Sequence, residues 1–254
     1  MKEIIGAADA VMIDRGDLSV ETNLENLALF QKRIIEASRA AAKPVIVATE
    51  MLHTMIVNPV PTKAEVSDIS NAVLDGCSAT MLSGETAVGA FPFDAVRTMR
   101  QIANAAAHYF HDDSDARQPS PAAVANAISD AIVLICRSLP ITKIVAVTRS
   151  GYAARSIAAR RPRQPILAVS DDAFAARSFN LLGGVEGFHL DMPFSKTSLD
   201  HVAQCLEMLW RQGAVVDADT VLVTAVGYPR SGNRMNLLQT HVMRDLVETL
   251  SWHK

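Results

Sequence analysis

The chain has 254 residues and a formal net charge of −3 at pH 7, with 49% hydrophobic and 20% charged residues. This composition excludes disordered and fibrous proteins, and the length is enough to bury the core of one large domain or two ordinary ones. The mildly acidic balance, with 5% aromatic residues, offers no basic surface for nucleic acid.

No apolar run approaches the ~18 residues of a membrane span, and no cationic N-terminal region precedes a long apolar stretch. We therefore expect a soluble cytoplasmic protein without membrane partners. Its three cysteines, Cys77, Cys136 and Cys205, are far apart and mostly have apolar neighbours. We interpret them as reduced core thiols rather than as zinc ligands or a nucleophile.

Short β-rich runs alternate with longer helical patterns through the first 110 residues, which predicts parallel strands joined by crossover helices. Thr62 and Glu65 form a T-x-x-E capping box at the start of one helix, and Gly76 follows its end. The expected strands are Ala10–Asp14, Val45–Ala48 and Ala79–Leu82, and the helices that follow them are Leu24–Ala41, Lys63–Leu74 and Phe93–Ala107.

Neither the helical nor the strand pattern of apolar residues continues between residues 108 and 120, where the sequence is polar and charged. We therefore expect a partial β/α domain at residues 1–110, a linker at 111–120 and a second α/β domain at 121–254, with a mostly parallel sheet and helices on both faces. After a first helix that carries Val124, Ile128, Ala131 and Ile135, its expected strands are Lys143–Thr148, Pro165–Val169, Gly184–Leu190, Thr220–Ala225 and Leu237–Met243, and its further helices are Ala153–Arg161, Ala173–Leu181 and Leu199–Arg211.

Polar segments follow all three strands of the first domain, at Asp14–Leu18, Thr49–Leu52 and Ser83–Thr86. Parallel α/β folds bind ligands at the carboxyl ends of their strands, so we expect one common site there. Gly16 allows the backbone to approach a ligand, and Asp17 supplies a carboxylate suited to Mg²⁺. From the residues alone the alternative stays open that Asp17 and Glu85 only pair with Arg15 or cap a helix.

Four segments together resemble the pyruvate kinase family: Asp9–Leu18 (DAVMIDRGDL), Pro44–Leu52 (PVIVATEML), Asn58–Gly76 (NPVPTKAEVSDISNAVLDG) and Met81–Ala87 (MLSGETA). Their order and spacing also match, and the resemblance continues more loosely through the second domain. It implies phosphoryl transfer from phosphoenolpyruvate to ADP in glycolysis, with Mg²⁺ and K⁺. It also implies a β/α barrel followed by a regulatory α/β domain.

The resemblance covers about half of the family's pattern, because the three strands look like the last three of an eight-stranded barrel. The first five strands, the capping domain, the K⁺ ligands and the strand bearing Lys-x-Glu, which supplies the transfer Lys and the second Mg²⁺ ligand, have no match in this chain. We therefore expect a truncated family member that is inactive as an isolated chain. The alternatives are an effector-binding or oligomerisation module, or one subunit of a split enzyme.

The resemblance also implies roles for single residues. Asp17 matches the Mg²⁺ ligand, and the amides of Gly16 and Asp17 match those that hold the carboxylate of phosphoenolpyruvate. Thr49 matches the residue beside the reacting carbon. The other matches to the catalytic rim are Arg15, Ser83 and Glu85.

Four positions depart from the family's pattern: Asp14 stands for a usual Ala, Ser19 for Gly, Glu50 for Gln and Lys63 for Arg. Asp14 and Glu50 add negative charge beside a site for anions, so we expect weaker substrate affinity. Three unclosed barrel strands leave two sheet edges open, so we also expect a homo-oligomer or a companion N-terminal chain.

In the second domain, Thr148–Gly151 follows a strand and opens a helix, an arrangement that can hold a phosphate. This segment resembles the family's effector loop, and Gly227–Asn233 resembles the loop that closes over the effector. A sugar phosphate or nucleotide would be the ligand, and an ordinary turn is the alternative. The candidate effector residues are Thr148, Arg149, Ser150, Gly151, Arg230, Ser231 and Gly232.

Overall fold

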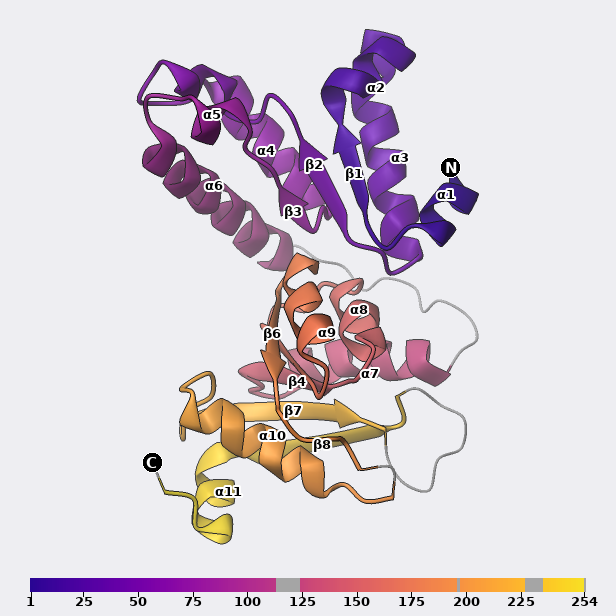
Figure 1. Cartoon of the computed structure of the whole chain (residues 1–254), viewed down its shortest axis with the longest axis vertical. Coiled ribbons are helices and arrows are strands. Elements are labelled where there is room, and N and C mark those ends of the chain that lie inside the picture. The colour runs from indigo at the N-terminus through magenta and orange to yellow at the C-terminus, as the bar shows by residue number, and fades with distance from the viewer. Residues whose placement is uncertain (113–123, 196, 227–234, 254) are drawn as a thin grey trace. The chain divides into compact units, whose positions relative to one another are not determined.

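The computed structural model describes residues 1–112, 124–195, 197–226 and 235–253 (Figure 1). The chain divides into two compact units, Met1–Ala116 and Arg117–Lys254. Within the described ranges, no helix is long and apolar enough to cross a membrane.

The first unit is built on a three-stranded parallel sheet in the order β1-β2-β3. Val11 pairs with Val45 and Ile46 with Ala79, so each strand lies beside the next along the chain, as expected. The strands are β1 (Val11–Asp14), β2 (Val45–Ala48) and β3 (Ala79–Thr80). β3 is shorter than the expected strand, although the Met81 amide still donates to the Val47 carbonyl at 2.9 Å.

The three predicted crossover helices are present, with α3 shorter than expected and α4 and α6 longer. α6 continues to Asp112, five residues beyond its expected end at Ala107, and so includes the first two residues of the expected linker at 111–120. α2 starts directly after β1 and was not expected. The helices are α1 (Lys2–Ala7), α2 (Arg15–Glu21), α3 (Leu27–Ala40), α4 (Lys63–Asp75), α5 (Gly84–Ala87) and α6 (Pro92–Asp112), with 3₁₀ turns η1 (Leu24–Asn26) and η2 (His53–Ile56).

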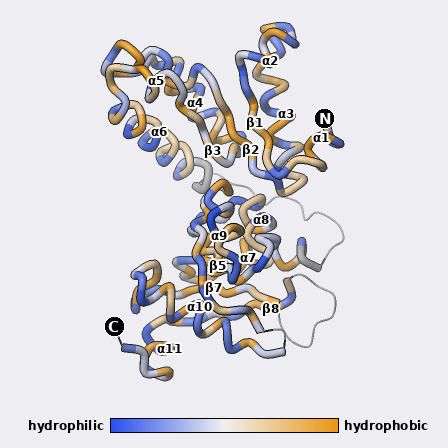
Figure 2. The backbone as a smooth tube through the Cα atoms, viewed as in Figure 1, coloured by the Kyte–Doolittle hydropathy of each residue, from blue (hydrophilic) through white to orange (hydrophobic). Residues whose placement is uncertain are grey.

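The core of the first unit lies between the sheet and helices α3, α4 and α6. Hydrophobic and hydrophilic residues alternate along α6, which packs its apolar side on α4 (Figure 2). Met51 and Met55, which follow β2, are fully buried in the same core. The core residues are Ile13, Ile35, Val45, Val47, Met51, Leu52, Met55, Ile69, Ala72, Ala95 and Met99.

The second unit has a five-stranded sheet in the order β6-β5-β4-β7-β8, parallel except for β8, which pairs antiparallel with β7. The mostly parallel sheet is therefore confirmed. Its strands are β4 (Lys143–Val147), β5 (Ile166–Ser170), β6 (Val185–His189), β7 (Thr220–Ala225) and β8 (Leu237–Val242). Its helices are α7 (Val124–Ser138), α8 (Tyr152–Ala158), α9 (Ala173–Ser178), α10 (Asp200–Arg211) and α11 (Met243–Leu250), with a 3₁₀ turn η3 (Phe179–Leu181).

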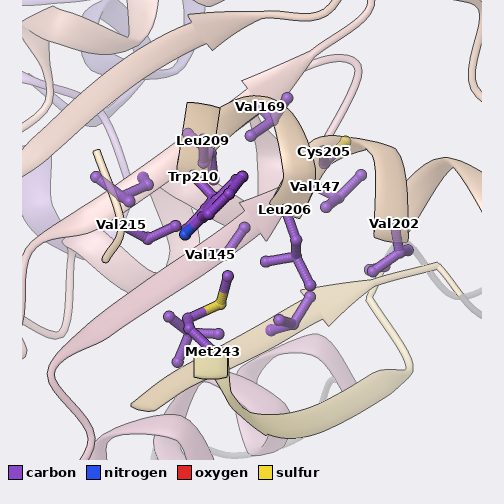
Figure 3. Packing of buried hydrophobic residues seen from close by; sticks show 14 of the residues in the cluster. Val145, Val147, Val169, Val202, Cys205, Leu206, Leu209, Trp210, Val215 and Met243 are labelled. Atoms are coloured by element: carbon purple, nitrogen blue, oxygen red, sulfur yellow. The ribbon is translucent and has the colours of Figure 1, made fainter. Parts of the chain in front are cut away.

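Helices cover both faces of this sheet, because its strands are apolar at consecutive positions. Val145 and Val147 of β4 pack in one core with Leu206 and Trp210 of α10 (Figure 3). Ile144 and its neighbours on the other face pack against α7 and α8. α11 was not expected, since it follows β8 without a separating turn.

Glu65 ties the start of α4 to the turn after β2. Its carboxylate accepts hydrogen bonds from the amides of Thr62 and Thr54, both at 2.7 Å, while Thr62 Oγ1 accepts from the Glu65 amide at 3.2 Å. Burial opposes ionisation of Glu65, but these hydrogen bonds lower its pKa overall. The predicted capping box is therefore confirmed.

Glu65→Ala should lower the free energy of unfolding of the first unit by about 1 kcal/mol, because two amides lose their acceptor. Glu65→Gln keeps one carbonyl oxygen and should lose less. Urea unfolding followed by hydrogen exchange of residues 45–75 measures the effect. Fluorescence of Trp210 and Trp252, the two tryptophans of the chain, reports the second unit and should not change. An unchanged first unit in Glu65→Ala would contradict the prediction.

Candidate functional site

The Arg15 side chain joins the carboxyl ends of β1 and β2. Its Nε donates to the Thr49 carbonyl at 3.0 Å, Nη2 donates to the same carbonyl, and Nη1 forms an ion pair with Asp68 of α4. The side chain is only 10% exposed. The structure thus pairs Arg15 with Asp68, and not with Asp17 or Glu85, which was one half of the alternative interpretation; the other half was that these carboxylates cap a helix.

Thr49 completes this junction with its hydroxyl group. Thr49 Oγ1 accepts from the amides of Arg15 at 2.9 Å and Gly16 at 3.2 Å, and it donates to the Ala48 carbonyl at 2.6 Å. Thr49 and the exposed Glu50 have φ values of 69° and 53°, a left-handed conformation that is uncommon for residues other than glycine. Strained backbone of this kind is concentrated at ligand sites.

Asp14 caps α2 at the same junction. Its Oδ1 accepts from the amides of Gly16 at 2.9 Å and Asp17 at 3.3 Å. The Asp17 carboxylate lies in the first turn of α2, and the residue is exposed. The structure therefore brings together four of the residues singled out from the sequence, namely Arg15, Gly16, Asp17 and Thr49.

Glu85 and Ser83 are joined to the loop after β2. Glu85 is 3% exposed, and its two carboxylate oxygens accept from the amides of Leu52 at 3.0 Å and Ser83 at 2.8 Å. Burial opposes its ionisation, but hydrogen bonds from backbone amides, with a smaller contribution from His53, lower the pKa of Glu85 overall. The buried carboxylate thus holds two loops together.

Asp17 is the candidate ligand for Mg²⁺. No group of three or more His, Cys, Asp or Glu residues that could hold a metal ion occurs in the described part of the chain. Mg²⁺ is commonly held by one or two carboxylates together with substrate phosphates and water. Asp17 therefore fits as one ligand of such a site, and the remaining ligands must come from elsewhere.

The loop Thr148–Gly151 lies at the carboxyl end of β4, before α8. Gly151 has a φ of 75°, and a Cβ at this position would lie 2.4 Å from the Phe179 ring, so the turn requires glycine. Arg149 Nε donates to both carboxylate oxygens of Asp171 at 3.0 and 3.1 Å, and Nη2 pairs with the same carboxylate. Arg230, Ser231 and Gly232 lie outside the described residues.

Asp171 is a charged residue that the sequence did not single out. Its side chain is 6% exposed and also accepts from the Phe194 amide at 2.9 Å. Burial opposes ionisation, but Arg149 and this amide lower the pKa of Asp171 overall. Its position after a buried β-rich run is the same signal that pointed to Asp14 at the end of the first strand.

His201 also escaped the sequence-based search. It is 5% exposed and stacks on Phe194 with ring centroids 5.0 Å apart, while its Nδ1 has no hydrogen-bond partner among the described residues. Burial lowers the pKa of His201, against the opposing charges of Asp171 and Asp200. Burial likewise raises the pKa of Cys205, four residues later, to about 12. That thiol is unsuited to act as a nucleophile.

Comparisons with known proteins cover both units. The family model described as pyruvate kinase, barrel domain, matches residues 1–96, and the model described as pyruvate kinase, alpha/beta domain, matches residues 126–241. The pyruvate kinases of Geobacillus stearothermophilus and Agrobacterium vitis are both 38% identical to the chain, over 96% and 93% of its length.

A crystal structure of a pyruvate kinase from Cryptosporidium parvum superimposes with a TM-score of 0.78 and 32% identity, over 94% of this chain and 48% of that one. The chain spans 42% of the Geobacillus protein and 50% of the Agrobacterium protein. The family match of residues 1–96 to a barrel domain and the three parallel strands of the first unit together show that these strands are part of a β/α barrel.

Glu85→Gln should destabilise the first unit by about 1–3 kcal/mol at pH 7, because one buried amide then faces an NH₂ group instead of an acceptor. The folded-state pKa of Glu85 is lowered, so its ionised form stabilises the fold. This contribution is complete above the ordinary pKa of 4.5 and is lost as the pH falls through the folded-state pKa.

The stability difference between wild type and Glu85→Gln should therefore shrink below pH 4.5. Urea unfolding of the first unit between pH 7 and pH 3, read by hydrogen exchange, measures it. The matched control is Glu50→Gln at an exposed carboxylate, which should change stability by less than about 0.5 kcal/mol. A difference between wild type and Glu85→Gln that grows on acidification would refute this assignment.

Proposed function

The chain belongs to the pyruvate kinase family, and on this basis we propose that its first unit forms one side of a site for phosphoryl transfer from phosphoenolpyruvate to ADP. The observation that carries this proposal is the junction at the ends of β1 and β2. There Arg15 and Thr49 hold the strand ends together beside the exposed Asp17. A site at the carboxyl ends of barrel strands is where this fold places its chemistry.

Each residue at this junction has a proposed role. Asp17 holds Mg²⁺, which when bound supplies positive charge that offsets the phosphate oxygens. The amides of Gly16 and Asp17 face the substrate carboxylate, and the Thr49 hydroxyl lies beside the reacting carbon. Arg15 is a positioning residue, since its guanidinium contacts the Thr49 carbonyl and Asp68.

Ser83 and Glu85 form the next part of the proposed rim. Glu85 acts on the backbone of the neighbouring loops, because its two carboxylate oxygens accept from the amides of Leu52 and Ser83. We assign it the role of fixing the Ser83 loop against the loop after β2. The exposed Ser83 is then held at the edge of the site, where it can contact substrate.

These 254 residues supply only part of the charge that phosphoryl transfer needs. Such transfer depends on positive groups that surround the phosphoryl group from several directions. Arg15 is paired with Asp68, and Lys63–Glu65, the single Lys-x-Glu of the sequence, opens α4 instead of ending a strand. We propose that the other barrel strands, the transfer Lys, the second Mg²⁺ ligand and the K⁺ site come from outside these residues, on the same polypeptide or a companion chain.

We propose a cytoplasmic, oligomeric enzyme in which the second unit is regulatory. The family match of residues 126–241 and the glycine turn that opens α8 support the regulatory role alone. The ligand of this turn would be a sugar phosphate or a nucleotide. Arg149 would reach it only by leaving Asp171, so the Thr148 and Ser150 hydroxyls and the loop amides are its first contacts.

The isolated 254-residue chain should show no phosphoryl transfer from phosphoenolpyruvate to ADP. A chimera in which this chain replaces the matching 42% of the Geobacillus stearothermophilus enzyme should catalyse this phosphoryl transfer. In the chimera, Thr49→Ala should lower kcat by about 10²-fold or more, whereas Thr22→Ala, a matched change at the end of α2, should not. A lactate dehydrogenase-coupled assay measures all four proteins.

Turnover by the isolated chain in the usual kinase range of ~1–100 s⁻¹ would refute the division of the site between this chain and other residues. A chimera that folds, binds phosphoenolpyruvate and has the same kcat with Thr49→Ala would refute the role of Thr49.

A sugar phosphate or nucleotide that binds the Thr148–Gly151 turn should raise the melting temperature of the second unit, followed by Trp210 and Trp252 fluorescence, by several degrees at saturation. Ser150→Glu should abolish the shift through charge repulsion, and Ser138→Glu, at the end of α7, should preserve it. If a panel of hexose mono- and bisphosphates and nucleotides shifts nothing, the segment is an ordinary turn.

A further inference from the structure

Three consecutive amides at the start of α2 donate to acceptors of the chain itself. The Arg15 amide donates to Thr49 Oγ1 at 2.9 Å, and the Gly16 amide donates to Asp14 Oδ1 at 2.9 Å and to Thr49 Oγ1 at 3.2 Å. The Asp17 amide donates to Asp14 Oδ1 at 3.3 Å. One carboxylate oxygen therefore occupies both amides that the proposed function assigns to the substrate carboxylate.

The geometry of β1 holds Asp14 in this position. Asp14 is the last residue of β1 and pairs with Ala48 of β2, and its backbone is extended, with φ −82° and ψ 107°. A Cβ at Gly16 would lie 3.1 Å from Asp14 Oδ1, so the absence of a side chain at Gly16 lets the carboxylate settle over the amides. The end of β1 thus positions the Asp14 carboxylate to accept hydrogen bonds from the α2 amides.

A tethered carboxylate competes with a free one at high effective concentration, on the order of millimolar or above for short tethers. A ligand carboxylate must displace Asp14 Oδ1 to reach the same amides. The negative charge of Asp14 also repels the ligand carboxylate as it approaches. Thr49 Oγ1 adds no charge, so Asp14 is the residue that disfavours an anion.

We propose that Asp14 is a specificity-determining residue that occupies the Gly16 and Asp17 amides and weakens the binding of carboxylate ligands at the end of β1. The inference rests on the proposed function, since it concerns the same amides. It attributes the weaker affinity expected from the sequence to a competing hydrogen-bond acceptor, in addition to the charge of Asp14. Removing the carboxylate should free the Asp17 amide, leave the Gly16 amide with only the uncharged Thr49 Oγ1, and strengthen carboxylate binding.

The test is a titration of the full ¹⁵N-labelled chain with phosphoenolpyruvate and excess Mg²⁺, read at the Gly16 and Asp17 amide resonances. Asp14→Ala should lower Kd by at least ~10-fold relative to wild type. Asp14→Asn keeps a neutral cap oxygen that preserves the helix start, and it should give a smaller gain. Glu50→Gln removes one charge nearby without touching the amides, and it should change Kd by about 2-fold at most. Pyruvate, which has the carboxylate but no phosphate, should show the same order of affinities.

Equal Kd values for wild type and both Asp14 variants would overturn the inference and leave the proposed site standing. A gain in Glu50→Gln as large as in Asp14→Asn would also overturn it, because charge alone would then suffice. If the Gly16 and Asp17 amide resonances shift with ligand in neither the wild type nor any variant, both this inference and the carboxylate site of the proposed function are overturned. Circular dichroism of each variant verifies that the first unit is folded.

Discussion

The guanidinium of Arg15 is the interaction on which the first unit's rim depends. It is held between the Thr49 carbonyl and Asp68, so it fixes the ends of β1 and β2 to each other and to α4. A planar, permanently charged fork satisfies a carbonyl and a carboxylate together, which a lysine could not do with the same geometry. The left-handed backbone at Thr49 and Glu50 is sustained by this anchoring. The Thr49 hydroxyl adds a second tie, because it accepts from the Arg15 and Gly16 amides at the start of α2.

Carboxylates of the chain itself occupy several groups that would otherwise attract anions. Asp68 pairs with Arg15, Asp14 occupies the amides of α2, and in the second unit Asp171 pairs with Arg149. Each unit therefore pairs the arginine nearest its candidate site with a carboxylate of its own. Binding of an external anion becomes an exchange of one carboxylate for another ligand, and its free energy is correspondingly smaller than for open groups.

Much of the fold could be predicted because the buried strands carry strong local signals. β2 and β7 were predicted to the residue, since apolar β-branched runs are bounded there by polar residues and turns. α2 and α11 were missed because each follows a strand without a separating turn. The site residues of β1 and β2 followed from the position of loops after parallel strands. The role of Glu85 did not, because the Leu52 amide that donates to its carboxylate is a backbone group 33 residues away, which no side-chain pattern reveals.

The Asp14 cap also bears on how such a protein can evolve. The oxygen that occupies the α2 amides also stabilises the start of that helix, so ligand affinity and helix stability depend on the same atom. Aspartate and alanine codons can differ by a single base, so one base change could replace this carboxylate by the methyl group of alanine. That change would free the Asp17 amide and remove the Asp14 cap of the helix at once, so a gain in ligand affinity would come with a loss of stability.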